Sequence, residues 1–298
     1  MKRVLVTGAE GFIGKNVCRF LVKNGYQIVT LDKNKSSQEF KHIQLDVTDA
    51  SISKTLQEIR PDVIVHLAAQ IDVMGSFEDP IVDLRSNAEG TLNLIRSSIE
   101  SGCANFVYIA SGGALYDSNQ VLPIKEDGIE LPVSPYGLTK QLGEGYVRVF
   151  SEKASTQWSS LALSNCYGPV VEHGRGVIFQ FWNALSNGKT PFINGKSVTR
   201  DMVHVDDVCR AIALTIEKPT NCRVNISSGK EVSLLVLFQI ISRELKSEVA
   251  PELRDHIAGE VERSALNNSK AFNLLGWTPA ITLEEGIKNS LPKKEIKI

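Results

Sequence analysis

A tyrosine and a lysine lie four residues apart in segment 134–140, which reads Ser-Pro-Tyr-Gly-Leu-Thr-Lys. Residues at this spacing share one face of a helix, and Ser134-Pro135 is a typical helix start. The pKa of a free tyrosine is about 10, too high for a base at neutral pH. An ammonium group at Lys140 and an oxidised nicotinamide would each favour the phenolate and lower that pKa. The pair therefore predicts proton transfer at Tyr136, assisted by Lys140.

A glycine-rich segment follows the first apolar run of the chain, Val4-Leu5-Val6. Glycines at a spacing of three let the backbone turn sharply and approach a pyrophosphate, while the next helix points its N-terminus at the phosphate charge. The segment lies between a predicted strand and a predicted helix, as a dinucleotide site requires. The residues that we expect in this loop are Gly8, Gly11, Phe12, Ile13 and Gly14.

Asp32 ends the second apolar run, eighteen residues after Gly14. A carboxylate at this position accepts hydrogen bonds from both ribose hydroxyls of NAD and repels a 2′-phosphate. A turn-forming aspartate in Asp32-Lys33-Asn34 is the structural alternative. Lys33 is a neighbouring cation that could tolerate NADP. We predict NAD as the cofactor, and the sequence leaves NADP open.

Short apolar runs at 4–6, 28–31, 63–67 and 106–109 alternate with helical patterns. Between the first two runs, the apolar residues Ile13, Val17, Phe20 and Leu21 share one helical face. Strands that alternate with helices imply right-handed crossovers and a parallel sheet. We expect a Rossmann-type doubly wound α/β domain over residues 1–165. A smaller mixed α/β part, richer in Gly and Pro, should cover 166–298, with some segments returning to the first domain.

The composition excludes several classes of protein. With 33 Lys and Arg against 34 Asp and Glu, the net charge is −1, so no basic surface for nucleic acid is expected. No stretch has the length of a membrane span, and the first apolar run breaks at Thr7-Gly8, too early for a signal peptide. The five cysteines are scattered without metal-type spacing, which favours reduced thiols in the cytoplasm and no metal site.

Together these motifs resemble the extended short-chain dehydrogenase/reductase family, in its nucleotide-sugar epimerase, dehydratase and reductase branch. The resemblance covers nearly the whole chain, and the order of the motifs makes it specific. The matching segments are TGAEGFIG at 7–14, LD at 31–32, LDV at 45–47, HLAAQ at 66–70, NAEGTLNL at 87–94, SPYGLTK at 134–140, NCYGP at 165–169 and RDMVHVDDV at 200–208.

The resemblance implies further cofactor contacts. Asp46 and Val47 would hold the adenine, Ala68 and Ala69 would line the phosphate and ribose, and Asn87 would contact the nicotinamide half. The structural alternatives are a turn for Asp46, plain packing for the alanines and a helix cap for Asn87. Lys140 would also bind the nicotinamide ribose.

For the substrate, the resemblance implies a nucleotide diphosphate held by Asn165, Lys189 and Arg200. A guanidinium suits a phosphate particularly well, because it donates two parallel hydrogen bonds. Ile257 occupies the place of a usual phosphate-binding arginine, and Arg263 or Arg254 would replace it.

The chain departs from the family in segment 110–116. Gly112 stands where the family carries its catalytic serine or threonine, so that the hydroxyl is missing or is supplied by Ser111. The 4,6-dehydratases carry an Asp-Glu pair where Gly113 and Ala114 stand here. Because glycine and alanine cannot transfer protons, we do not expect a 4,6-dehydratase.

The leading hypothesis is an NAD-dependent 4-epimerase of a UDP-hexose type of nucleotide-sugar, with Tyr136 as the base and a transient 4-keto intermediate. The alternative is an NAD(P)H-dependent reductase of a nucleotide-linked 4-keto-6-deoxy sugar. A non-catalytic dinucleotide sensor is a third reading, against which the intact Tyr136 and Lys140 argue.

By resemblance we also expect a homodimer. The helix of Tyr136 would present Leu138, Leu142, Tyr146 and Val149 to a second copy, together with the helix that holds Leu92, Leu94 and Ile95. Packing within one chain is the alternative for these residues.

Overall fold

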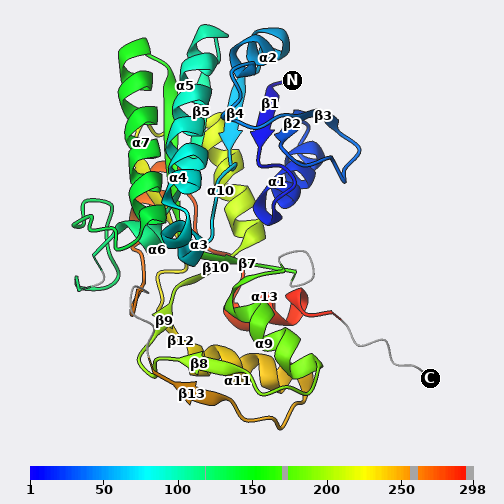
Figure 1. Cartoon of the computed structure of the whole chain (residues 1–298), viewed down its shortest axis with the longest axis vertical. Helices are drawn as coiled ribbons and strands as arrows, with labels where there is room; N and C mark the ends of the chain where they lie inside the picture. Colours follow the sequence, from blue (N-terminus) through cyan, green and yellow to red (C-terminus); the bar gives the residue numbers. More distant parts are fainter. Residues whose placement is uncertain (118, 170–173, 256–260, 293–298) are drawn as a thin grey trace.

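The computed structural model describes residues 1–117, 119–169, 174–255 and 261–292. Within them, the main sheet has seven parallel strands in the order β11-β6-β5-β4-β1-β2-β3 (Figure 1). The strands are β1 (Arg3–Thr7), β2 (Gln27–Asp32), β3 (Lys41–Gln44), β4 (Val63–His66), β5 (Asn105–Ser111), β6 (Gln157–Leu163) and β11 (Arg223–Ile226). The predicted parallel α/β sheet is confirmed.

The first strands form where the sequence has β-branched and aromatic runs. The predicted runs match β1, β2, β4 and β5 to within two residues. In the centre, Val4 lies beside Ile28 on one side and Val63 on the other. Both faces of these strands are covered, which explains why the runs are continuously apolar rather than alternating.

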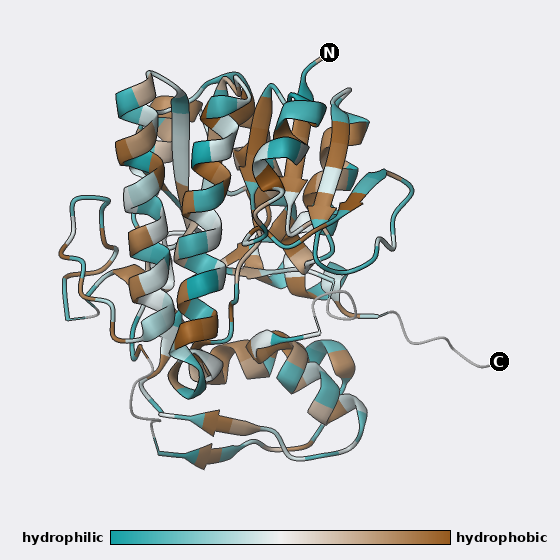
Figure 2. Cartoon of the chain, turned by 45° about the horizontal axis from the view of Figure 1, so that its top comes forward, coloured by the Kyte–Doolittle hydropathy of each residue, from teal (hydrophilic) through white to brown (hydrophobic). Residues whose placement is uncertain are grey.

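Helices cover both faces of the sheet (Figure 1). One face carries α1 (Phe12–Lys23), α10 (Val205–Glu217) and α12 (Ser269–Leu275), and the other carries α2 (Ile52–Ile59), α5 (Gly90–Glu100) and α7 (Pro135–Ala154). Side chains of β1 alternate between the two cores: Val4 and Val6 enter the first, and Leu5 enters the second. Figure 2 shows the hydrophobic strands lying among helices in which hydrophobic and hydrophilic residues alternate.

The predicted start of the helix at Ser134-Pro135 is confirmed, and the end of α1 is also well defined. In α1, Lys23 is the last helical residue, Asn24 is the C-cap, and Gly25 follows with a φ of 82°. The N-cap of α7 is Ser134, whose side chain accepts a hydrogen bond from the backbone N–H of Gly137 at 3.1 Å. This cap fixes where the first turn of α7, and therefore Tyr136, lies.

One expectation about α5 was wrong. Leu94 and Ile95 are fully buried in the core beneath the sheet, so neither side chain can meet a second copy of the chain. The period of the helix turns these two residues toward the sheet, and Leu92 is half-buried. On α7, by contrast, Leu138, Leu142 and Val149 are exposed.

The strand order reverses between β1 and β4. After β1 the chain adds β2 and β3 on one side, then crosses over and adds β4, β5 and β6 on the other side of β1. In doubly wound sheets, a ligand binds in the crevice outside the carboxyl ends of the strands at such a switch point. This topology places a candidate site above Thr7 and His66, the last residues of β1 and β4.

The second part of the chain builds a smaller mixed α/β body at one end of the sheet (Figure 1). It has its own apolar core, to which α9 (Gly176–Ser186), α11 (Leu234–Leu245) and α13 (Leu283–Ser290) contribute. Its strands form two-stranded pairs: β10 (Met202–His204) with β7 (Asn165–Tyr167), β12 (Val232–Ser233) with β9 (Thr199–Arg200), and β13 (Glu252–Arg254) with β8 (Phe192–Asn194).

Segments of the second half also belong to the main sheet: β11 pairs with β6, and α10 packs beside α1. The division of the chain at residue 165 stays a prediction. All five cysteines are free. Among the described residues, no helix combines the length and the apolar character that crossing a membrane requires.

Candidate active site

A cleft of about 1170 Å³ lies at the carboxyl ends of the strands, between the main sheet and the smaller body. Its lining brings together most of the residues that the sequence singled out. They are Gly8, Gly11, Phe12, Ile13, Gly14, Asp32, Asp46, Val47, Ala68, Ala69, Ser111, Tyr136, Lys140, Asn165 and Arg200. Residues far apart in the sequence therefore share one site at the topological switch point.

The glycine-rich loop forms a cradle that only glycine permits. Gly8 has a φ of 67°, and a Cβ atom there would lie 2.5 Å from the backbone N of Ala68. A Cβ at Gly14 would lie 2.2 Å from the carbonyl oxygen of Gly8. The loop runs into the N-terminus of α1, the position that suits a pyrophosphate. The residues present therefore fit a dinucleotide.

Asp32 ends β2 at the opposite side of the cradle from β4, and its side chain is held from two directions. Oδ2 accepts a hydrogen bond from the backbone N–H of Glu10 at 3.0 Å. Oδ1 accepts hydrogen bonds from the backbone N–H and the side-chain amide of Asn34 at 2.9 and 3.1 Å. The turn that the sequence offered as the alternative is present, and the carboxylate also lines the cleft.

Tyr136 lies in the first turn of α7, next to the end of β5. The Ser111 side chain, at the last residue of β5, lies close enough to the phenol to affect its pKa, and both residues line the cleft. Burial raises the pKa of Tyr136 above its ordinary value, the Ser111 hydroxyl lowers it, and the charge of Asp83 raises it. The protein alone therefore does not produce the low pKa that we expected from the neighbouring ammonium.

Lys140 lies one turn further along α7 and is 5% exposed. Its Nζ lies 4.2 Å from the centre of the Tyr108 ring, whose hydroxyl donates a 3.0 Å hydrogen bond to the carbonyl of Lys140. Burial lowers the pKa of Lys140 to about 7, although the charges of Glu144 and Asp83 act to raise it. Lys140 can therefore gain or lose its charge near neutral pH.

A buried carboxylate that our sequence reasoning missed lies behind this pair. Asp83 in α4 (Pro80–Leu84) is fully buried and accepts hydrogen bonds from Thr139 at 2.5 Å and from Asn87 at 3.0 Å. Burial raises its pKa. Thr139 lies between Tyr136 and Lys140, so Asp83 fixes the turn that carries both. The spacing of Asp83 and Asn87, four residues apart before α5, is the signal that could have indicated it.

Asn87 itself does not line the cleft. Its side chain accepts from the backbone N–H of Gln70 at 2.8 Å and donates to the carbonyl of Gln70 at 3.0 Å. Gln70 lines the cleft. Asn87 therefore holds the loop after β4 in place, and its contact with the nicotinamide half stays a prediction.

Gly112, which has no hydroxyl, directly follows β5. A Cβ at Gly112 would lie 2.3 Å from Cδ1 of Leu266, so a side chain here would require the Leu266 side chain to move. Ser111 carries a hydroxyl close to the Tyr136 phenol instead. Gly113 and Ala114 line the cleft, and at these two positions the site has no acid or base.

Two of the residues expected at the substrate diphosphate do not come to the cleft. Lys189 is exposed after the end of α9. Arg263 forms an ion pair with Glu231 at 2.6 Å. Arg200 does line the cleft and donates from Nη1 to the carbonyls of Thr199 and Val261 at 2.9 and 2.8 Å. Ile257 lies outside the described residues.

Three further residues that the sequence did not single out line the cleft: Glu10, Arg175 and Ser264. Glu10 stands inside the glycine-rich loop, where a charged residue between glycines was a usable signal. Arg175 precedes α9, and Ser264 follows the segment in which we sought a substitute arginine. The last two come from parts of the chain without a motif of their own, so only the fold could bring them here.

The switch-point cleft, the glycine cradle, Asp32 and the Ser111–Tyr136–Lys140 group define an enzyme of the short-chain dehydrogenase/reductase type with NAD as its cofactor. Residues 4–227 match the sequence profile of the NAD dependent epimerase/dehydratase family. The chain belongs to this family, as the motifs predicted.

Relatives with known activities include UDP-glucose 4-epimerase of Mycolicibacterium smegmatis, which is 36% identical over 305 residues, with 97% of each chain covered. The dTDP-4-dehydro-6-deoxyglucose reductase of Escherichia coli is 28% identical over 300 residues, with 95% of each chain covered. The family resemblance therefore includes enzymes of both reaction types that the sequence left open.

Solved structures of nucleotide-sugar epimerases are also similar to this chain. The UDP-glucose 4-epimerase of Thermotoga maritima, in a structure with UDP-glucose, has a TM-score of 0.92 and 33% identity, with 97% of each chain covered. The UDP-glucose 4-epimerase of Thermus thermophilus, in complex with NAD, has a TM-score of 0.89 and 28% identity, with 97% of each chain covered. The fold is therefore that of the nucleotide-sugar epimerases over almost the whole chain.

Proposed function

We propose that this protein is an NAD-dependent 4-epimerase of a UDP-hexose. The observation that carries this proposal is the Ser111 hydroxyl close to the Tyr136 phenol, in one cleft with the glycine cradle and Asp32. A non-catalytic sensor has no need of a hydroxyl beside a buried phenol. The glycine and alanine at 113 and 114 argue against a 4,6-dehydratase.

Tyr136 is the base that accepts the proton of the sugar 4-hydroxyl, and Ser111 orients the phenol and lowers its pKa. The glycine cradle and Asp32 would hold NAD, which when bound would supply reversible hydride chemistry at C4 and a positive charge in the cleft. That charge is needed, because burial and Asp83 leave the pKa of Tyr136 raised in the protein alone. Protonated Lys140 adds a second positive charge that favours the phenolate of Tyr136.

The smaller body binds the nucleotide diphosphate while the 4-keto sugar turns its other face to the site. Asn165 and Arg200 line the cleft on this side and are the residues that we propose for the diphosphate. The guanidinium of Arg200 is fixed by carbonyl oxygens of the segment around Val261, so a phosphate would meet an oriented donor.

A second candidate, favoured by Lys33 on the cleft beside Asp32, is an NAD(P)H-dependent reductase of a nucleotide-linked 4-keto-6-deoxy sugar. The E. coli relative has this type of activity by its name. The two functions differ in whether reduced cofactor is consumed. A reductase lowers NADH absorbance in proportion to product, whereas an epimerase does not.

The test is a proton NMR time course of the purified protein with UDP-glucose and UDP-N-acetylglucosamine and no added cofactor. We expect a growing galacto-type anomeric signal with one of the two. The matched variant Tyr136→Phe should show no turnover and retain NAD binding. An unchanged spectrum for the native chain, together with NADH consumption on a 4-keto sugar nucleotide, would replace this proposal by the reductase.

A further inference from the structure

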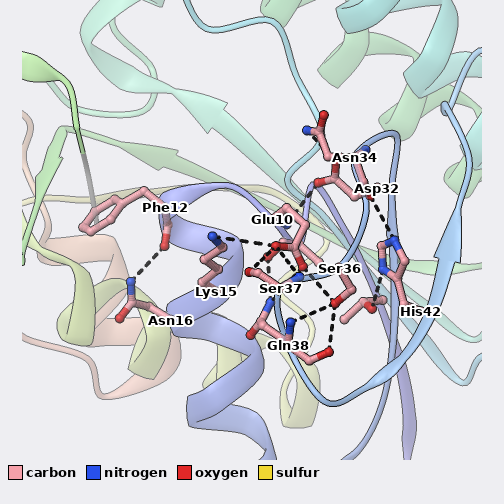
Figure 3. Close-up of polar contacts among 12 residues, drawn as sticks. Glu10, Phe12, Lys15, Asn16, Asp32, Asn34, Ser36, Ser37, Gln38 and His42 are labelled. Carbon is pink, nitrogen blue, oxygen red and sulfur yellow. Dashed lines mark hydrogen bonds and ion pairs between the residues drawn. The ribbon is translucent and has the colours of Figure 1, made fainter. Parts of the chain in front are cut away.

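The carboxylate of Glu10, inside the glycine-rich loop, binds the segment that follows β2 (Figure 3). Its side chain is 6% exposed. Oε2 accepts hydrogen bonds from the backbone N–H and the hydroxyl of Ser37 at 3.1 and 2.6 Å. Oε1 accepts from the Ser36 hydroxyl at 3.1 Å and from the Gln38 amide at 3.4 Å. This one carboxylate therefore holds residues 36–38 against the phosphate loop.

Glu10 is also joined to Asp32. The backbone N–H of Glu10 donates to Oδ2 of Asp32, while Asn34 donates to Oδ1 (Figure 3). Glu10, Asp32 and Asn34 all line the cleft. Two acidic residues therefore line the part of the cleft where the adenosine ribose of a dinucleotide lies in a Rossmann fold.

Glu10 is ionised at neutral pH. Burial raises the pKa of Glu10, but the hydrogen bonds from Ser37, Gln38 and Ser36 outweigh it, and the pKa lies below the ordinary value. The nearest cation is Lys15, whose Nζ lies 3.7 Å from Oε2 of Glu10.

Two more basic residues follow Asp32 in this region, Lys33 and His42. Lys33 lines the cleft next to Asp32. His42 is engaged on both nitrogens, with the Thr30 hydroxyl at 3.0 Å and the carbonyl of Asn34 at 3.0 Å. Two lysines, Lys15 and Lys33, therefore accompany the two carboxylates at this end of the cleft.

We infer that Glu10 is a specificity-determining residue that, together with Asp32, selects NAD over NADP. The 2′-phosphate of NADP adds a charge of about −1.5 to −2 at pH 7. It is attached to the ribose whose hydroxyls would donate hydrogen bonds to Asp32 in NAD. It therefore meets the charge of Glu10 in addition to that of Asp32. At separations of several ångströms near a protein surface, one such like charge changes affinity by on the order of tenfold. The inference concerns the cofactor and does not depend on which sugar is the substrate.

The test uses the full-length chain, freed of nucleotide and titrated calorimetrically with NAD and with NADP. The variant Glu10→Gln keeps an oxygen that accepts hydrogen bonds and removes the charge. We expect it to tighten NADP binding by on the order of tenfold and to change the affinity for NAD by less than about threefold. The nucleotide that co-purifies with the variant should accordingly contain a larger share of NADP.

The matched control is Ser37→Ala, which removes one hydrogen bond to the same carboxylate and leaves its charge in place. It should leave the ratio of the NADP and NAD dissociation constants unchanged. In the native chain this ratio should fall as salt is raised, and in Glu10→Gln it should fall less. If Glu10→Gln weakens both cofactors alike, or if Ser37→Ala alters the ratio equally, Glu10 only shapes the loop and the inference is wrong.

Discussion

At the scale of single residues, the surroundings of Tyr136 oppose its ionisation. The pKa of the phenol is raised by burial and by Asp83, and the hydroxyl of Ser111 is the group of the protein that lowers it. Ser111 is the last residue of β5, and the side chain of Leu266 packs over Gly112, the next residue. The hydroxyl that the resemblance places at residue 112 is absent, and Ser111 carries one at the preceding position.

We therefore predict that Ser111→Ala raises the pKa of Tyr136. The base form of the phenol would then be populated only at higher pH, so the acid limb of the kcat/KM profile moves toward higher pH. The loss at neutral pH should be roughly a hundred- to a thousandfold, the effect of removing one positioned hydrogen-bond donor. Ser111→Thr keeps the hydroxyl and should leave the limb in place. A Ser111→Ala profile that superimposes on the native one would contradict this role.

At the scale of elements, the loop between β1 and α1 depends on the absence of side chains. A Cβ at Gly14 meets the carbonyl oxygen of Gly8 at 2.2 Å and the Cα of Ala9 at 2.7 Å. Because these are backbone atoms, the steric overlap can be removed only if α1 moves away from the loop. A moved α1 no longer presents its N-terminus to a pyrophosphate.

Gly14→Ala should therefore lose NAD affinity by at least about tenfold, measured by calorimetry. The matched control is Gly145→Ala in α7, where an added Cβ has nothing within 4 Å. There the change should stabilise the helix by about 0.5–1 kcal/mol and leave NAD binding unchanged. Equal NAD affinity in the two variants would be incompatible with the cradle.

Ion pairs of Arg223 connect β11, at the edge of the sheet, to α7. Arg223 on β11 pairs with Glu144 of α7 at 2.8 Å and with Glu130 at 2.5 Å, and the side chains of Arg223 and Glu144 are 13% and 8% exposed. Arg223→Ala leaves a buried carboxylate without its partner and should cost about 3–5 kcal/mol in unfolding free energy.

The control for this prediction is Arg148→Ala, which removes an exposed pair with Glu152 on the same helix. It should cost less than about 1 kcal/mol. Denaturant unfolding of both variants measures the difference. If both lose the same stability, the ion pairs of Arg223 do not tie β11 to α7.

The sequence predicted those elements whose signals are local. The apolar runs, the glycine-rich loop and the cap at Ser134 each depend on neighbouring residues, and all three are confirmed. The burial of Leu94 and Ile95 and the position of Asp83 depend on contacts between distant segments, which one sequence does not contain. The sequence did name Ser111 as a possible replacement for the hydroxyl missing at Gly112, but only the fold brings Ser111 and Tyr136 into one cleft.

At the scale of the whole molecule, α7 presents apolar residues that this chain does not bury. Leu138, Leu142 and Val149 are 54%, 43% and 51% exposed on one helix. The neighbouring helices α3 (Val73–Glu78) and α4 pack on α7 and carry Phe77 and Ile81, which are exposed and lie outside the cleft lining. An exposed apolar surface of this kind is typical of an interface.

We propose that this surface joins two copies of the chain. Light scattering at micromolar concentration should then give the mass of a dimer, and Leu142→Glu should shift it to a monomer. Val22→Glu, at an exposed apolar residue on α1, is the control and should stay dimeric. A dominant monomer for the native chain would overturn the proposed homodimer.

The most direct test of the account follows the hydrogen at C4 of the sugar. UDP-glucose and UDP-N-acetylglucosamine, each labelled with deuterium at C4, are incubated with the native chain in ordinary water, without added cofactor. We predict a galacto-type product from at least one of them, with the deuterium retained at C4, because the label leaves and returns within one cleft. A product that has lost the label to water, or the absence of any epimer from both, would contradict the proposed 4-epimerase.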